Sequence, residues 1–437
     1  MIYRANHIGM PALTPSDLQS LAAACSAGHP LPPRDGRDIS IWEITSWILP
    51  MAPEHFRRVL AATPGLPQGT AGAEGGTRWF RPADLAPLRA HFASGPRKAR
   101  YLPPRHAQAP LVTLTGPLGG MGRSTALLHL ATGAALSGYR ILVIDGDPAG
   151  SLGLDLPAAP GHGDDTGATS GAGVLSLIAR SAARHLRRLN EGRLDRGEVP
   201  QPMDAVLTAA LTLGAADLIR PSLWPGLDVM PAPPALLQAD LQMAGWGHAL
   251  RGWSAGPALA AALEEDGVRQ RYDLILCDTP RGLGPLALAL LTSADHLLAP
   301  LPLRDRGLDR LAAGLQALGS ATARVDAAVL QTARALGQTA GPQTWGGLSV
   351  LATRAGPDAA RQMAGFAAKL GDTLLPIPLP EVEAVARGQI AQAYDLDYRA
   401  LGRLAYAPLR EACDAHVRSV LAKLAASLAG VSPRNPQ

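Results

Sequence analysis

Three short segments of this sequence carry residues that together could bind phosphate and a divalent cation. The first is a glycine-rich turn, PLGGMGRST (117–125). The second and third are the acidic turns IDGDP (144–148) and CDTP (277–280), each of which follows an apolar run. A glycine-rich turn that leads into a helix presents backbone N–H groups to phosphate oxygens, and carboxylates are preferred ligands of Mg²⁺. The three segments therefore predict a site for a nucleotide with its metal ion.

The elements that must position these segments are predicted from the surrounding pattern. Apolar strands are expected from Leu111 to the glycine-rich turn, at 140–145 and at 272–278, with a helix after the glycine-rich turn. The carboxyl ends of parallel strands lie at one edge of a sheet, where open α/β sheets bind their ligands. We expect an α/β fold, namely a P-loop NTPase-like, mostly parallel sheet with helices on both faces.

The glycine-rich turn departs from the common phosphate-loop pattern, G-x-x-x-x-G-K-[ST]. Arg123 stands where the pattern has lysine, and Pro117 where it has the first glycine. Ser124 supplies the hydroxyl that binds magnesium. Such a turn could also be purely structural, but its occurrence in order with both acidic turns favours phosphate binding. The predicted nucleotide-binding residues are Gly119, Gly120, Met121, Gly122, Arg123, Ser124 and Thr125.

Composition excludes several other classes of protein. The 437 residues are 47% hydrophobic and 17% charged. No apolar run is long enough to span a bilayer, and the N-terminal residues lack the apolar core of a signal peptide, so we expect a cytoplasmic protein. The three cysteines lie far apart without a CxxC pair, which excludes a zinc cluster. Only three of the 40 basic residues are lysine, so replacement of lysine by arginine is general in this chain.

The N-terminal third carries the positive charge. Residues 1–110 hold twelve Lys and Arg against seven Asp and Glu, a balance of +5 within a total of +4. Ser40 and Glu43 have capping-box spacing, which predicts a helix that starts at Ser40 and stops before Pro50, followed by a second helix from Pro53. A glycine-rich turn, a short strand and another helix complete a winged helix-turn-helix pattern. The alternative is a helical accessory domain with solvated arginines. The candidate DNA contacts in this region are Arg57, Arg58, Arg78 and Arg81.

These patterns divide the chain into four parts. We predict an N-terminal helical segment (1–35), a small winged helix-turn-helix domain (36–92), a Pro- and Arg-rich linker (93–110) and a nucleotide-binding domain (111–430). Within the last part, residues 157–173 have the composition of a flexible loop.

The three turns resemble those of the ParA/MinD family of P-loop ATPases, and within it the RepA-type proteins that partition plasmids. That family has a deviant loop, K-G-G-x-G-K-[ST]-[ST], a strand ending in D-x-D-P and a later strand ending in D-x-P. The matching segments here are LGGMGRST, IDGDP and CDTP. The segments LWPGLDVMPAP (223–233) and LSVLATRAGPDAARQM (348–363) also resemble the family.

The resemblance implies roles for particular residues. Ser124 and Asp278 would hold Mg²⁺, and Asp145 is a further candidate metal ligand. Asp147 would position the attacking water, with Arg123 at the phosphates. The segment GDTLLPIPLPEVEAV (371–385) looks like the last core strand entering the loop that approaches the adenine. The resemblance further implies that Arg304, Arg306 and Arg310 contact DNA without sequence specificity.

The resemblance also implies an ATP-dependent homodimer and a ParB-like centromere-binding partner, acting on DNA near the nucleoid and away from the membrane. The family lysine that crosses to the partner's phosphates is Leu118 here, and the second lysine is Arg123. Neither leucine nor the planar guanidinium replaces an ammonium group at a phosphate. We therefore expect a ParA-like partition protein with weak or lost ATP hydrolysis. The alternatives are a non-hydrolysing DNA-binding scaffold and a MinD-like positioning ATPase.

Overall fold

The computed structural model describes the part of the chain that carries all three motifs. The described residues are Ser16, Ser20, 36–72, 77–95, 100–105, 107–116, 118–159, 172–304, 306–335, 345 and 347–429. The chain forms two compact units, residues 1–35 and residues 36–437. Apart from Ser16 and Ser20, the predicted N-terminal segment lies outside the described residues, as do Pro117 and most of the predicted loop at 157–173.

The first module of the larger unit is a small three-stranded antiparallel sheet with helices. Its sheet has the order β1-β3-β2. Ser40 and Glu43 form the predicted capping box at the start of α2, which continues into a π-helix before Pro50. The elements follow the predicted order: β1 (Ile39–Ser40), α2 (Ile41–Glu43), η1 (Ile44–Ile48), α3 (Pro53–Ala62), β2 (Thr70–Ala71), β3 (Arg78–Phe80), η2 (Pro82–Asp84) and α4 (Leu85–Ala93). This order is compatible with a winged helix-turn-helix, and that assignment stays a prediction.

The second module is built on a seven-stranded sheet with the order β10-β9-β4-β8-β5-β7-β6. Every neighbouring pair is parallel except β6 and β7. The predicted fold class is therefore confirmed. The strands are β4 (Leu111–Leu114), β5 (Ile141–Asp145), β6 (Arg220–Pro221), β7 (Leu227–Met230), β8 (Leu274–Asp278), β9 (His296–Pro302) and β10 (Leu348–Thr353).

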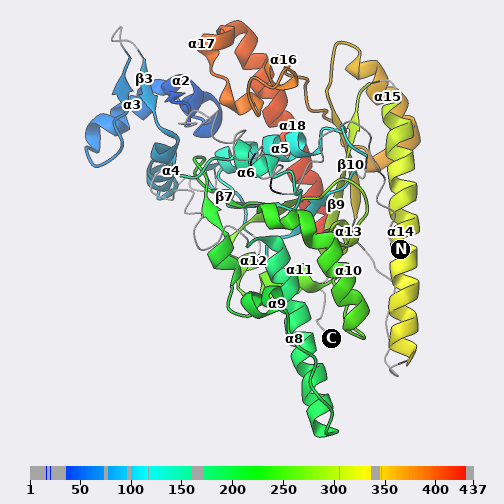
Figure 1. Ribbon diagram of the computed structural model, residues 1–437. Coiled ribbons are helices and arrows are strands. Elements are labelled where there is room, and N and C mark those ends of the chain that lie inside the picture. The colour runs from blue at the N-terminus through cyan, green and yellow to red at the C-terminus, as the bar shows by residue number, and fades with distance from the viewer. Residues whose placement is uncertain are drawn as a thin grey trace. The chain divides into compact units, whose positions relative to one another are not determined.

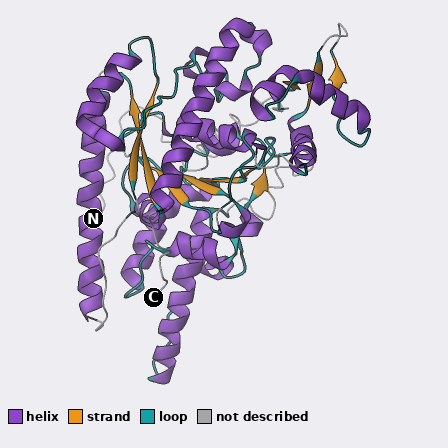
Figure 2. Ribbon diagram, turned by 180° about the vertical axis from the view of Figure 1, so that it is seen from behind, coloured by secondary structure: helices purple, strands orange, loops and turns teal. Residues whose placement is uncertain are grey.

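Alternate residues of the central strands point into two separate cores, so both faces of the sheet are covered by helices (Figures 1 and 2). One face packs α5 (Arg123–Leu136), α6 (Ser151–Asp155) and α18 (Arg403–Ala429). The other packs α8 (Val174–Asp195), α9 (Ala205–Ala210), α10 (Ala239–Ala249), α11 (Ala258–Glu265), α12 (Val268–Arg271) and α13 (Pro285–Ser293). Helices α14 (Gly307–Ala335) and α15 (Ala359–Leu370) pack against β9 and β10.

The connection from β10 to α18 differs from the sequence prediction. Residues 371–385 do not form a continuous core strand. Isolated bridges at Leu374 and Pro380 and single backbone bonds, such as that from the Leu379 N–H to the Ala352 carbonyl, join this segment to β10 and the loop after it. It contains instead the short helices η6 (Gly371–Thr373) and α16 (Glu383–Ala386) and leads to η7 (Ala393–Asp395) and α17 (Tyr398–Leu401). Its many prolines lack the N–H groups that a strand needs.

The N-terminal module and the nucleotide-binding part share one hydrophobic core. Phe56 and Phe80 belong to the same buried cluster as Tyr101, in the predicted linker, and as Val417 of α18. The predicted linker at 93–110 therefore does not separate two independently packed bodies within residues 36–437. In the described part of the chain, no helix combines the length and the apolar character needed to cross a membrane.

Candidate nucleotide-binding site

The topology of the sheet brings the three sequence motifs to one edge. Strand β4 ends directly before the glycine-rich turn, and its Leu114 is the register partner of Asp278 at the end of β8. Asp278 is in turn the partner of Asp145 at the end of β5. Because the three strands are parallel neighbours, the turns that follow them lie together at the carboxyl edge of the sheet.

The glycine-rich turn has the backbone geometry of a phosphate cradle. Gly120 and Gly122 have φ angles of 75° and 78°, in the left-handed region that favours glycine. Gly122 is also the N-cap of α5, so the first N–H groups of this helix face the turn. Met121 is buried in the same hydrophobic cluster as Leu311 of α14, which anchors the turn to the core. Its predicted binding role therefore falls to its backbone.

Arg123 turns its side chain inward onto the acidic residues. Its Nε donates to Asp278 Oδ1, its Nη1 donates to the Gly116 carbonyl at 2.9 Å, and its Nη2 donates to Asp147 Oδ2 at 3.1 Å. The side chain is only 7% exposed. All three nitrogens of the guanidinium are therefore engaged within the protein. The predicted catalytic pair, Arg123 and Asp147, is in direct contact.

Ser124 and Asp278 are the predicted metal ligands that lie together. Ser124 Oγ donates to Asp278 Oδ2 at 2.5 Å. Burial raises the pKa of Asp278, and the neighbouring Arg123 opposes that rise. Asp145 has a different environment, since its carboxylate accepts the N–H groups of Asp147 at 3.1 Å and Gly153 at 3.2 Å. It holds the acidic turn in shape, and its role as a metal ligand stays a prediction.

The donor types at Ser124 and Asp278 fit a magnesium ion. Mg²⁺ is usually bound through one or two protein oxygens together with substrate phosphates. Among the described residues, no three His, Cys, Asp or Glu side chains converge as a protein-only metal site. A metal ion would have to replace the hydrogen bond between Ser124 and Asp278, and it would lie close to the positive charge of Arg123.

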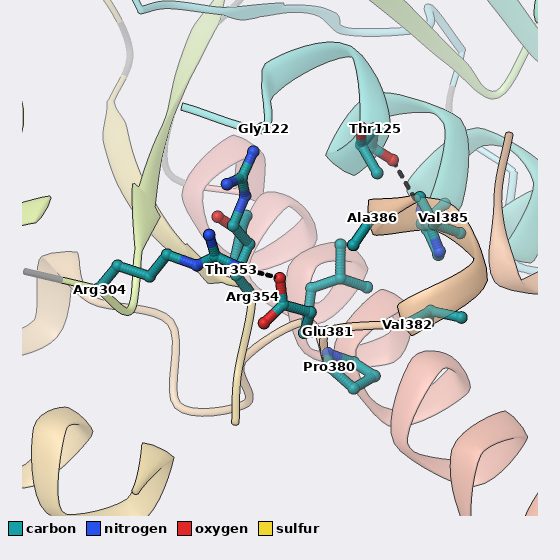
Figure 3. A pocket seen from close by; sticks show the side chains of 12 residues that line it. Gly122, Thr125, Arg304, Thr353, Arg354, Pro380, Glu381, Val382, Val385 and Ala386 are labelled. Carbon is teal, nitrogen blue, oxygen red and sulfur yellow. Dashed lines mark hydrogen bonds and ion pairs between the residues drawn. The ribbon is translucent and has the colours of Figure 1, made fainter. Parts of the chain in front are cut away.

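A cavity of about 190 Å³ opens beside the N-terminus of α5 (Figure 3). One wall is apolar and includes Val382, Val385 and Ala386. The opposite wall carries Arg354 and an ion pair between Arg304 and Glu381. The segment at 371–385 thus approaches the phosphate loop, although as a loop and short helices and not as a strand.

His129 forms part of the floor of the cavity. Its ring nitrogens bond to the Thr125 carbonyl at 2.7 Å and to the Ala393 N–H at 3.0 Å. Burial lowers the pKa of His129 to about 4, so the ring is neutral, with Nδ1 donating and Nε2 accepting. It connects α5 to η7.

Sequence reasoning missed two further arginines near the phosphate loop and gave a third another role. Arg281 and Arg354 both come close to the loop. If Gly119 carried a Cβ atom, that atom would lie 3.7 Å from Arg281 Nε, and a Cβ atom at Gly122 would lie 3.9 Å from Arg354 Nε. Arg310, predicted to contact DNA, donates Nη2 to the Gly119 carbonyl. Arg281 follows Asp278 in the same turn, a spacing that could have indicated its position.

The predicted DNA-binding arginines lie on exposed surfaces in two places. In the N-terminal module, Arg57 and Arg58 are exposed on α3, and Arg78 and Arg81 are exposed at β3 and directly after it. Arg78 donates to the Gln68 carbonyl at 2.7 Å, and Arg58 contacts His55 at 3.0 Å. In the second module, Arg304 and Arg306 follow β9; Arg304 lines the cavity, and Arg306 has a φ angle of 60°. Figure 1 shows α3 and β3 at one side of this unit and α14, which follows Arg306, at the other.

The fold and the site define a P-loop nucleotide-binding protein. A family model described as an AAA domain matches residues 111–329, half of the chain. Together with the sequence relatives, this match shows that the chain belongs to the ParA/MinD family of P-loop ATPases, related to replication and partition proteins.

Two relatives and one solved structure illustrate the similarity. The chain is 29% identical over 207 residues to the chromosome-partitioning ATPase Soj of Thermus thermophilus, covering 47% of this chain and 60% of Soj. It is 28% identical over 240 residues to a putative replication protein A of Sinorhizobium fredii, covering 53% of this chain and 49% of that protein. A solved structure titled partition protein matches with a TM-score of 0.50 and 16% identity, covering 88% and 95% of the two chains. At that identity the structure supports the fold alone.

Proposed function

We propose that this chain is a ParA-like partition protein that binds ATP at the phosphate loop and couples the bound nucleotide to dimerisation and DNA binding. The observation that carries the proposal is the meeting of Ser124, Asp278 and Asp147 beside the glycine-rich turn. The relatives named as partitioning ATPases support the cellular role, although the match covers 60% or less of the two curated relatives described above.

The site offers a place for each part of the nucleotide. The backbone N–H groups of Gly119 to Thr125 would hold the phosphates at the N-terminus of α5. The cavity beside Thr125 would take the base and ribose against Val382 and Val385. Ser124 and Asp278 would hold Mg²⁺, which when bound neutralises phosphate charge.

Hydrolysis at this site is proposed to be slow. The carboxylate of Asp147, the candidate for orienting the water, already accepts a hydrogen bond from Arg123. For Arg123 to reach a phosphate, its guanidinium would have to leave Asp278, which is fully buried. Removing one partner of a buried ion pair is costly because the remaining charge stays unsolvated. Leu118, in the position of the other family lysine, carries no charge that could stabilise the transition state.

The basic surfaces suggest how DNA would be bound. Arg57, Arg58, Arg78 and Arg81 would provide specific contacts through the N-terminal module. Arg304 and Arg306 would contact the phosphate backbone from a homodimer of the nucleotide-binding part. A ParB-like centromere-binding protein is the proposed partner, in the cytoplasm at the nucleoid.

A second candidate function is a DNA-binding scaffold that binds nucleotide without turnover. The engagement of Arg123 with Asp147 and Asp278 favours it, because the carboxylate of Asp147 is then less available to orient a water molecule for attack. A MinD-like role at a membrane has less support. The residues Cys413, Val417 and Val420 of α18 are buried in the core shared with α5, so they are not available to a lipid surface.

The DNA part of the proposal is tested by measuring binding of the full-length protein to labelled duplex DNA with ATP, with ADP and without nucleotide. We expect ATP to strengthen binding about tenfold or more. Replacing both Arg57 and Arg58 with alanine should weaken binding. It should also make the plot of log affinity against log salt concentration shallower, by about one unit of slope for each lost phosphate contact.

The matched control for this experiment is Arg418→Ala, which removes an exposed arginine of α18 outside both proposed DNA surfaces. Its DNA affinity should equal that of the wild type. Equal affinity with ATP, ADP and no nucleotide would refute the coupling. An unchanged affinity after the double replacement would refute the assignment of the α3 arginines.

A further inference from the structure

The phosphate loop contains no free cationic side chain of its own. Arg123 is its sole basic residue among 118–125, and all three guanidinium nitrogens are bonded to Asp278, Asp147 and the Gly116 carbonyl. A nucleoside triphosphate brings several negative charges, and strong phosphate sites pair such charges with arginine or lysine. Tight binding therefore requires cations from elsewhere in the chain.

Two arginines from different elements lie against this loop. Arg310 comes from the first turn of α14 and donates Nη2 to the Gly119 carbonyl. Arg281 comes from the turn after β8 that also carries Asp278. A Cβ atom placed on each glycine shows how close these side chains come: it would lie 3.6 Å from Arg281 Cδ at Gly119 and 3.8 Å from Arg310 Nη2 at Gly120. Both side chains therefore reach the apex of the loop.

Both guanidinium groups keep free donors. A guanidinium has five N–H donors in a planar fork that matches phosphate oxygens. Among the described residues, the guanidinium of Arg310 bonds to the Gly119 carbonyl alone, and that of Arg281 has no hydrogen bond or ion pair. Both residues are exposed, so a ligand can reach them.

We propose that Arg310 and Arg281 bind the outer phosphates of the nucleotide and replace the positive charge that the loop lacks. The inference rests on the proposed nucleotide binding and names the residues that would select di- and triphosphates. Arg123 would then remain the counter-ion of the two carboxylates in the bound state. The competing explanation is structural, because the bond from Arg310 to Gly119 also holds the loop in place.

Nucleotides of different phosphate number separate the two explanations. The affinities of adenosine, AMP, ADP and ATP are measured by competition against a fluorescent nucleotide, with the full-length wild type and the variants Arg310→Ala, Arg281→Ala and Arg310→Lys. Arg324→Ala is the matched control, since Arg324 is exposed on α14 about 20 Å further along the helix at 1.5 Å per residue.

We expect each alanine variant to weaken ATP binding about tenfold or more, ADP binding less, and AMP and adenosine binding by less than about twofold. Arg310→Lys should recover part of the loss, and Arg324→Ala should match the wild type.

Equal losses for all four ligands would mean a structural role, and no loss would mean no role; either result overturns the inference. A wild type that binds ATP no better than AMP also overturns it. If the wild type binds none of the four, the proposed function itself fails.

Discussion

The chemistry of this site depends on the direction in which one side chain points. Arg123 stands where most phosphate loops have lysine, and its guanidinium is directed at Asp278 and Asp147. A lysine offers a single compact charge, whereas arginine can satisfy two carboxylates and a carbonyl at once. Arg123 therefore supplies one positive charge to the two carboxylates that it contacts.

This arrangement makes Arg123 important for stability. In Arg123→Ala, Asp278 would lose its counter-ion while remaining buried, and we expect a loss of about 3–5 kcal/mol in the free energy of unfolding near neutral pH. Urea denaturation of the full-length protein measures this loss.

The loss should be smaller at acid pH, because burial raises the pKa of Asp278 and the variant can protonate it. Arg281→Ala is the matched control, since Arg281 is exposed in the neighbouring turn and its replacement should change stability by less than about 0.5 kcal/mol. A loss below about 1 kcal/mol for Arg123→Ala would contradict its role as counter-ion.

At the scale of the elements, the sequence predicts the site better than it predicts the cavity. The loop, both acidic turns and the strands before them follow from local patterns, and parallel pairing brings them together. The inward turn of Arg123 depends on Asp278, which is 155 residues away, and so it is not visible in a local pattern. The same holds for Arg310, which reaches the loop through the topology of α14.

Three buried histidines connect the elements around the sheet, and they predict an acid-sensitive fold. Burial lowers the pKa of His129, His296 and His416 to about 4. The unfolded chain, with histidine pKa values of about 6.5, binds more protons in this range, so stability falls as pH drops from about 6.5 to 4. Asp145 acts in the opposite direction, because its pKa is raised to about 7 by burial and by the nearby Asp278.

The net effect should be a loss of stability on acidification, on the order of 1 kcal/mol per pH unit for each histidine, partly offset by Asp145 and by Asp278, whose pKa burial also raises. Urea denaturation at pH 7 and pH 5 measures it. In His416→Asn, the amide can still donate to the Ile377 carbonyl but does not titrate. The number of protons taken up on unfolding at acid pH should therefore fall by about one, and the free energy of unfolding should depend less steeply on pH. Equal stability of the wild type at both pH values would contradict this account.

At the scale of the whole described unit, the N-terminal module is joined to the nucleotide-binding part by a buried polar junction. Glu43 of α2 forms an ion pair with Arg37 at 2.7 Å and accepts a hydrogen bond from Tyr406 of α18 at 2.7 Å. The sequence predicts Glu43 only as a helix cap. Its second role could not be predicted, because Tyr406 lies 363 residues further along the chain. The junction gives a physical connection between the candidate DNA-binding module and the helix that packs on α5.

At the scale of the whole molecule, we propose that this family member keeps the nucleotide site but has little turnover. The most direct test measures ATP binding and steady-state ATP hydrolysis of the full-length wild type and of a variant with both Leu118→Lys and Arg123→Lys, with and without DNA. The account predicts that both proteins bind ATP and that the double variant hydrolyses it at least about tenfold faster. Wild-type turnover equal to that of the double variant, or no ATP binding by either protein, would contradict it.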